Sequence, residues 1–241
     1  MSALLALVSL LQPSALAGER FFSWSYGADT VAPGTYELEP ISTVETHRED
    51  GVRVSEWEHE VEIEYGVWPG LEVGLYVVAS QTDDAALTFS GYKARVRYRP
   101  WPLGTYGVDV AGYLEYIGSP TFDTHGVEAK VILAHEGQDL RASLNVTGEL
   151  EISADGVEPV LEPTGGVAWR LNKHLALGLE GKVETVLVNP VEGPYFWAGP
   201  TLHLAGKESR IWWTLNAMGG LTDATRQDAV VEARSVVGID L

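Results

Sequence analysis

The chain alternates apolar and polar residues over long stretches. In the stretch EHEVEIEYGVWPG, glutamate occupies positions 58, 60, 62 and 64, and mostly apolar or aromatic residues lie between them. Successive side chains of a β-strand point to opposite faces, so this stretch predicts a strand with one acidic face and one mostly apolar face. A soluble sheet would bury the apolar face, whereas a membrane barrel would turn it toward lipid and the acids toward its lumen.

The same alternation recurs in twelve segments between Thr35 and the C-terminus. Each has roughly 10–13 residues, a length that suits a tilted membrane strand, and turn residues separate it from the next. No stretch after the first 17 residues has a convincing helical period. The predicted strands are Thr35–Thr46, Ser55–Val67, Leu71–Gln81, Leu87–Arg99, Tyr106–Gly118, Gly126–His135, Leu140–Ile152, Leu161–Leu171, His174–Val186, Tyr195–Ala205, Arg210–Gly219 and Ala229–Leu241.

The connections between these segments alternate in length. Five are short, such as WPG and NK, and the six others are longer and more polar, such as HREDGVRV and LVNPVEGP. Outer-membrane barrels have short periplasmic turns and longer extracellular loops, and an even strand number returns both termini to the periplasm. Aromatic residues near both sets of connections fit two girdles at the membrane interfaces. We therefore expect an all-β fold, a closed antiparallel transmembrane β-barrel of about 12 strands.

Composition narrows the functional classes. The 241-residue chain has a net charge of −18, which argues against a nucleic-acid partner bound through a basic patch. It has no cysteine, which excludes disulfides, thiol catalysis and thiolate metal sites. After the first 17 residues, no run of 18 or more apolar residues predicts a transmembrane helix.

Both ends of the chain carry signals typical of the bacterial envelope. The opening MSALLALVSLLQPSALAGER predicts a signal peptide (1–17) cut after Ala17; the alternative is a buried N-terminal helix. Residues 18–34 are then an N-terminal periplasmic segment, and residues 35–241 form the barrel. The final EARSVVGIDL resembles the C-terminal signal strand that the barrel-assembly machinery of Gram-negative bacteria recognises. We expect the bacterial outer membrane as the location, and its lipid and this machinery as partners.

The stretch YGADTVAPGTYELEP carries a second resemblance, with Gly34–Glu39 entering the first predicted strand. It is similar to the opening of the MetA-like (meta-pathway phenol-degradation) outer-membrane family. That family is described as transporters of hydrophobic or aromatic compounds. The resemblance implies a barrel and a transport role, although a charged lumen is a poor place for an oily ligand.

A basic row in the fourth predicted strand matches the acidic row in the second. Strands lie about 4.8 Å apart, so the rows are about 10 Å apart across the third strand, whose inner face includes the small residues Gly74 and Ser80. Charges facing lipid near the midplane would cost about 2–4 kcal/mol each, so both rows are expected to face the lumen. The predicted lumen and ion-pathway residues are Glu58, Glu60, Glu62, Glu64, Lys93, Arg95, Arg97 and Arg99.

This ladder has a structural and a functional interpretation. Opposed charges could lock the barrel wall and fill its interior, or they could set a field that orients solutes in a channel. In either case we expect the two rows to meet, and a paired reversal of Glu62 and Arg97 tests whether these two residues are coupled.

Catalytic patterns are weak. Ser42 and His59 fall on the outer faces of neighbouring predicted strands, an arrangement that outer-membrane phospholipases use, but no orienting Asn or Asp shares that face. No metal-binding motif such as HExxH occurs, so neither a metal site nor a cofactor is expected. A protease of the omptin type needs acidic and histidine groups together at the outer rim. Residues of these types occur there, but no spacing singles them out: His47, Glu49, Asp50, Asp83, Asp84, Asp123 and His125.

The sequence therefore predicts a porin-like channel or passive transporter for small solutes, with a charged lumen and without catalysis. The alternatives are an outer-membrane hydrolase of the lipase or omptin type and a soluble β-sandwich surface protein. In a sandwich, the row Leu71, Val73, Leu75 and Val77 would pack against the opposite sheet instead of facing lipid.

Overall fold

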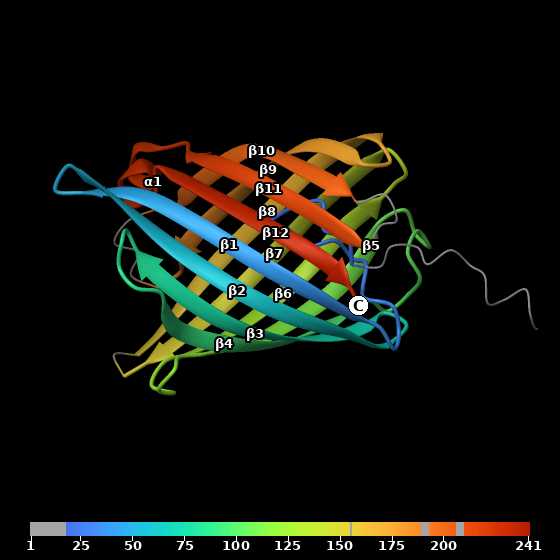
Figure 1. The fold of residues 1–241 in the computed structure, drawn as a ribbon, viewed down its shortest axis with the longest axis horizontal. Coiled ribbons are helices and arrows are strands. Elements are labelled where there is room, and N and C mark those ends of the chain that lie inside the picture. Colours follow the sequence, from blue (N-terminus) through green and yellow to red (C-terminus); the bar gives the residue numbers. More distant parts are fainter. Residues whose placement is uncertain (1–17, 155, 189–192, 206–209) are drawn as a thin grey trace, which may run out of the picture.

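The computed structural model describes residues 18–154, 156–188, 193–205 and 210–241. The expected signal peptide, residues 1–17, lies outside these ranges. The described strands form one closed barrel in which each strand pairs antiparallel with its neighbours in the chain, and β1 pairs with β12 (Figure 1). The strands are β1 (Tyr36–Glu49), β2 (Val52–Trp68), β3 (Leu71–Thr82), β4 (Thr88–Tyr98), β5 (Asp109–Gly118), β6 (His125–Glu136), β7 (Leu140–Ser153), β8 (Gly156–Asn172), β9 (Leu175–Val186), β10 (Tyr195–Ala205), β11 (Ile211–Gly220) and β12 (Val231–Asp240).

This architecture confirms the predicted antiparallel barrel of twelve strands. The alternating apolar rows face outward and stay exposed: Leu75 is 60% exposed, Val77 59% and Leu179 65%. A soluble sandwich would bury these side chains between its sheets, so the exterior excludes that fold. Closure also pairs the backbone of the first and last strands, as a lipid environment requires. Within the described residues, no helix is long and apolar enough to cross a membrane.

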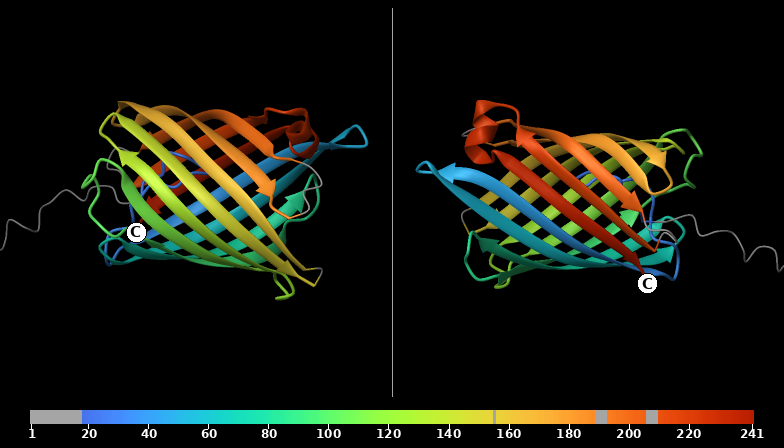
Figure 2. Two further views of the ribbon diagram at one scale, coloured as in Figure 1. Left: turned by 180° about the vertical axis from the view of Figure 1, so that it is seen from behind. Right: turned by 45° about the horizontal axis from the view of Figure 1, so that its top comes forward.

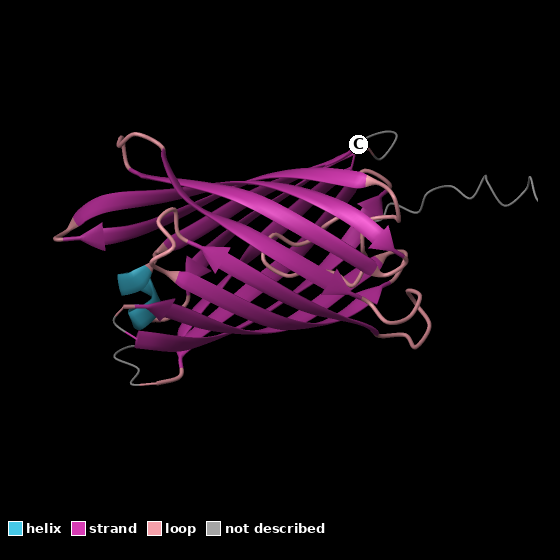
Figure 3. Cartoon of the chain, turned by 90° about the horizontal axis from the view of Figure 1, so that it is seen from below, coloured by secondary structure: helices cyan, strands magenta, loops and turns pink. Residues whose placement is uncertain are grey.

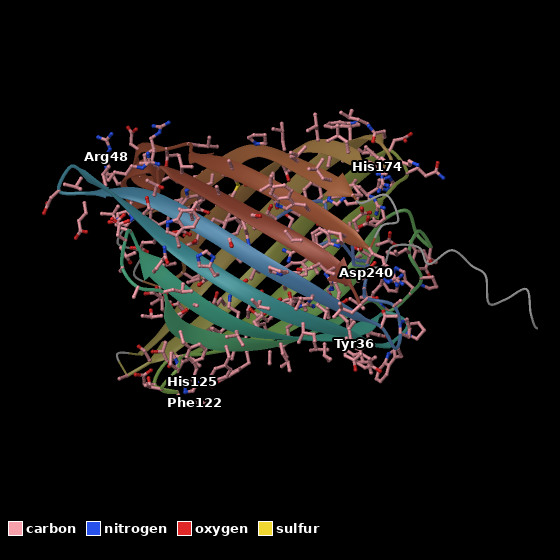
Figure 4. The ribbon with its side chains drawn as sticks, in the orientation of Figure 1. Tyr36, Arg48, Phe122, His125, His174 and Asp240 are labelled. Atoms are coloured by element: carbon pink, nitrogen blue, oxygen red, sulfur yellow. The ribbon has the colours of Figure 1, made fainter. Side chains whose placement is uncertain are left out.

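Exposed aromatic residues mark both ends of the barrel. Tyr36 lies at the end that carries the short turns, and Phe122 at the opposite end (Figure 4). At the first end, Tyr36 packs against Tyr65 with ring centroids 4.7 Å apart. At the other, Phe122 packs against Tyr92 at 5.2 Å. Amphipathic rings at two levels are the pattern of a bilayer-spanning barrel, and the apolar band between them is what lipid would cover.

The strict alternation of short and long connections is only partly right. Residues of the predicted first loop continue the strand ladder, so β1 and β2 form a hairpin that projects from the barrel (Figure 1) and turns at Asp50 and Gly51. Both turn residues have positive φ, +50° and +81°, as a tight two-residue hairpin turn requires. The β7–β8 connection is likewise short, whereas the β4–β5 connection, expected to be short, spans residues 99–108.

One connection holds a helix that the alternation did not predict. The segment α1 (Asp223–Asp228) lies between β11 and β12, at the end of the barrel opposite the C-terminus (Figure 3). Thr222 caps it, because its hydroxyl accepts a hydrogen bond from the backbone N–H of Thr225 at 3.2 Å. Six residues are too few to show a helical period in the sequence.

The segment 18–34 was expected to lie in the periplasm, but the structure places it inside the lumen. Its large side chains, among them Phe21, Phe22 and Tyr26, are buried within the barrel. Figures 1 and 2 show this blue segment coiled among the strands toward the end where the C-terminus lies. We call residues 18–34 the N-terminal plug.

The cysteine-free sequence allows a direct test of this topology. Cysteines at Asp84 and Thr121, in connections at the α1 end, should react with an impermeant thiol reagent on intact cells. Cysteines at Gly70 and Lys173, in turns at the opposite end, should react only after the outer membrane is broken. Labelling in the reverse order would show that the barrel has the opposite orientation.

Candidate functional site

The acidic row of β2 and the basic row of β4 face the lumen and meet across β3. Lys93 Nζ lies 2.5 Å from Glu60 Oε1, and Arg95 Nε lies 2.6 Å from Glu62 Oε1. These carboxylates are almost fully buried. Because β3 separates the two rows, long side chains have to reach over it, as the sequence led us to expect.

Arg95 is the centre of this network. Its guanidinium also contacts Glu64, lies 2.5 Å from Glu72 Oε1 and donates a hydrogen bond to the Tyr76 hydroxyl at 2.8 Å. The Arg95 side chain has no solvent exposure. A guanidinium has five N–H donors in a fixed plane, so one arginine can hold several carboxylates that a lysine could not. We call Arg95 and its carboxylate partners the arginine cluster.

Gly74 on β3 makes this crossing possible. A Cβ atom at Gly74 would collide with Glu62 Oε1 and would lie 2.9 Å from Arg95 Nε. Because glycine has no side chain, Glu62 and Arg95 can meet in the space above Gly74. Of the two small residues expected to allow the approach, Gly74 and Ser80, Gly74 is the one that lies between Glu62 and Arg95.

Glu62 and Arg97, the pair chosen to test coupling between the rows, have different partners. Arg97 lies directly opposite Glu72 in the β3–β4 register, and its Nη2 is 2.8 Å from Glu72 Oε1. Glu62 lies farther along β2 and pairs with Arg95 instead. Strand alternation predicts which face a residue occupies, but pairing along a face depends on register, which the sequence did not specify.

The two outermost residues of the predicted set take no part in the arginine cluster. Glu58 lines a cavity near the α1 end of the lumen. Arg99 follows the end of β4, and its Nη1 donates a hydrogen bond to the carbonyl oxygen of Trp101 at 3.2 Å.

Polar side chains of distant strands hold the backbone of the N-terminal plug. Glu180 of β9 accepts hydrogen bonds from the backbone N–H groups of Ser23 at 3.0 Å, Trp24 at 2.8 Å and Ser25 at 2.6 Å. Asn145 of β7 accepts from the N–H of Tyr26 at 2.6 Å and donates to its carbonyl oxygen at 3.0 Å. Buried backbone N–H and C=O groups need hydrogen-bond partners. The plug has no neighbouring strand that could supply them at these residues, so Glu180 and Asn145 supply them instead.

Charged and polar side chains of the strands bind the plug at further places. Arg20 Nη1 lies 3.0 Å from Glu39 Oε2 of β1, and His203 Nε2 of β10 lies 2.9 Å from Glu19 Oε1. The N–H of Val31 donates to Glu72 Oε2 at 2.7 Å, which joins the plug to the arginine cluster. This role was not predicted from the sequence, although the apolar residues of the stretch 21–31 were a signal that the segment is buried.

The plug has a cavity on each side. One, of about 280 Å³, lies toward the end of the barrel opposite α1. Its lining includes Glu19, Asp29, Glu136, Arg141 and Arg170. The other, of about 190 Å³, lies toward the α1 end. Its charged lining residues include more acids than bases: Glu58, Glu60, Glu115, Glu128 and Glu162 against Lys93, Lys130 and Arg234.

The structure also brings together Ser42 and His59 on the outer face. They lie opposite each other in the β1–β2 register, and Ser42 Oγ is 2.9 Å from His59 Nδ1. Among the described residues, no carboxylate or amide hydrogen-bonds to the other ring nitrogen of His59. A serine nucleophile normally needs both a base and a group that orients that base.

We therefore expect Ser42 to be unreactive. A fluorophosphonate probe added to the folded protein in detergent should leave it unlabelled, as it should the Ser42→Ala variant, which is the matched control. Covalent labelling of the unmodified chain that is lost in Ser42→Ala would instead identify Ser42 as an activated nucleophile.

The arginine cluster should contribute strongly to stability. Arg95→Ala leaves buried carboxylates without their cation, which costs about 3–5 kcal/mol when the site is dry. Urea unfolding in lipid vesicles measures this loss. Arg53→Ala, in the exposed β1–β2 hairpin, is the control and should change the free energy of unfolding by less than about 0.5 kcal/mol. Equal stability of the two variants would show that water solvates the cluster.

Comparisons with known proteins agree with the fold. The model of DUF6662, described as a family of unknown function, matches residues 14–142, more than half of the chain. None of the curated proteins matches.

Three solved structures cover most of the chain at low identity. The NanC porin has a TM-score of 0.58 and 11% identity over 86% of this chain and 100% of its own. The COG4313 outer membrane channel from Pseudomonas putida F1 has a TM-score of 0.62 and 7% identity, covering 89% of this chain and 98% of its own. The KdgM porin has a TM-score of 0.55 and 10% identity, covering 85% and 99%. Such likeness shows a shared barrel fold.

Proposed function

The chain belongs to DUF6662, a family of unknown function, and we propose that it is an outer-membrane channel for small solutes that its N-terminal plug holds closed. The observation that carries this proposal is a charged lumen with a cavity on each side of the plug. The exposed apolar wall supports placement in the outer membrane, with lipid as its surroundings. Three similar barrels, two porins and an outer membrane channel, agree with it.

The charged lumen favours a channel for polar solutes over a barrel with a purely structural role. Buried charges are costly to keep, and a barrel needed only for its wall could fill its interior with apolar side chains. The plug is held by hydrogen bonds to Glu180 and Asn145, which can be exchanged for bonds to water. We propose that the plug moves within the lumen to open the path, and that the protein has no catalytic role.

The charge of the cavity toward α1 favours cations. Its acidic lining residues outnumber its basic ones, and a ring of carboxylates attracts cations and repels anions at close range. We propose small cationic or neutral polar solutes as the cargo.

The MetA-like resemblance offers a second cargo, hydrophobic or aromatic compounds. The aromatic residues Trp24, Tyr26, Tyr76 and Tyr113, which line the same cavity, favour it. The many charges beside them oppose an apolar ligand, which could not replace their hydration.

The outward faces of Val237 and Ile239 on β12 support a separate proposal, that the barrel-assembly machinery recognises this final strand.

Conductance in planar bilayers tests the channel. The unmodified protein should open rarely, and the double variant Glu180→Ala, Asn145→Ala should conduct more often, because the plug loses the side chains that bind its backbone. Glu151→Ala, which removes an exposed carboxylate from a cavity that the plug does not line, is the control and should keep the low open probability.

Ion selectivity and solute flux test which solutes the channel passes. In a salt gradient, the reversal potential of the double variant should indicate a preference for cations. Liposome swelling with a polar solute and uptake of an aromatic hydrocarbon distinguish the two cargo classes. Absence of both conductance and flux in the folded double variant would overturn the channel proposal.

A further inference from the structure

Gly18, the first residue of the plug, lies in an acidic pocket at the base of β1. Its backbone nitrogen is 3.2 Å from Asp29 Oδ2. Its φ is +111°, and a Cβ atom at this position would collide with Glu37 Oε2. Only glycine combines this backbone conformation with such a close approach. Gly18 is therefore held against two carboxylates, and its nitrogen donates to that of Asp29.

Glu37 lacks a cationic partner. It has 0% exposure, and one of its oxygens accepts a hydrogen bond from Trp212 Nε1 at 2.7 Å. Its other oxygen, Oε2, has no hydrogen-bond partner among the described residues, and no Lys or Arg there forms an ion pair with it. A buried carboxylate left in this state is strongly destabilising.

Neighbouring acids make the need for positive charge greater. Oxygen atoms of Glu37, Glu39 and Glu64 lie within 4.8 Å of one another. The nearby cations are already engaged, because Arg20 pairs with Glu39 and Arg95 is shared within the arginine cluster. A further cation would offset part of this excess.

We propose that the α-ammonium group of Gly18, created by removal of the predicted leader, is the missing counter-ion of Glu37 and Asp29. Hydrolysis by a signal peptidase breaks the peptide bond between Ala17 and Gly18. Water supplies the hydroxyl of the new Ala17 carboxyl group and one hydrogen of the new amine, which takes a further proton from solvent. Maturation thereby replaces a neutral amide with a cation that locks the plug.

The α-ammonium fits this pocket better than the amide it replaces. The amide has one N–H donor and no charge, whereas the ammonium has three donors and a full positive charge. Asp29 accepts one of its hydrogen bonds, and Oε2 of Glu37 is available for another. An acyl group or further residue on this nitrogen would remove the charge or move it away. The inference concerns the plug's anchor and holds whether or not the barrel conducts.

N-terminal sequencing and amine labelling test the proposal together. Protein isolated from the outer membrane should begin at Gly18. A succinimidyl reagent at pH 7 modifies unprotonated amines, and a free α-amine has a pKa of about 7.7–8.0. In the folded protein the Gly18 amine should react at least about tenfold more slowly than in urea, because each unit of raised pKa lowers the reactive fraction tenfold.

Two variants separate pairing from burial. Glu37→Gln and Asp29→Asn keep the shape of the pocket but remove its charge, and each should speed labelling of the Gly18 amine toward the rate in urea. Glu45→Gln, on the inner face of the same strand at its other end, should keep the slow rate. Gel mobility without heating confirms that each barrel is folded, and if Glu37→Gln does not fold, Asp29→Asn decides alone.

Three results would overturn the proposal. The mature chain could begin at another residue, the folded and unfolded proteins could label at the same rate, or both charge variants could stay protected. Loss of protection on treatment with a chelator, restored by Ca²⁺, would assign the three glutamates to a metal ion instead. None of these readouts depends on conductance, so the anchor and the channel can fail separately.

Discussion

The structure depends on neutralising charge inside a closed barrel. The wall shields the lumen from bulk water, so each inward-facing ion needs a partner close by. Arg95 meets most of this need at one level by holding three glutamates from two strands. Gly74 matters for the same reason, because the strand between the two rows must present no side chain where they meet.

The plug follows from this constraint. A barrel of this size leaves space that its own side chains do not fill, and residues 18–34 occupy it with aromatic rings and hydrogen-bonded backbone. Glu180 offers its carboxylate to three consecutive N–H groups, so a buried negative charge and a buried backbone segment stabilise each other. The buried interior of this protein is thus largely polar, whereas its outer wall is apolar.

Alternation along the chain was enough to predict the strands and the face that each residue occupies. The bounds of β10 and the inward orientation of Glu62 and Arg95 could be read from a period of two residues. The partner of Arg97 could not, because it depends on register between strands. The position of the plug could not either, since irregular backbone has no period and its partners lie up to 194 residues away.

That separation has a consequence for the order in which the molecule assembles. Ladder contacts join neighbouring strands, so most of the wall can grow by adding one hairpin after another. The plug also binds β7, β9 and β10, and these contacts can form only when the later strands are present. Because the plug continues directly into β1, the strand at the closing seam, its docking brings the first strand to the last ones. The plug can therefore serve as an internal template for the closure of β1 against β12.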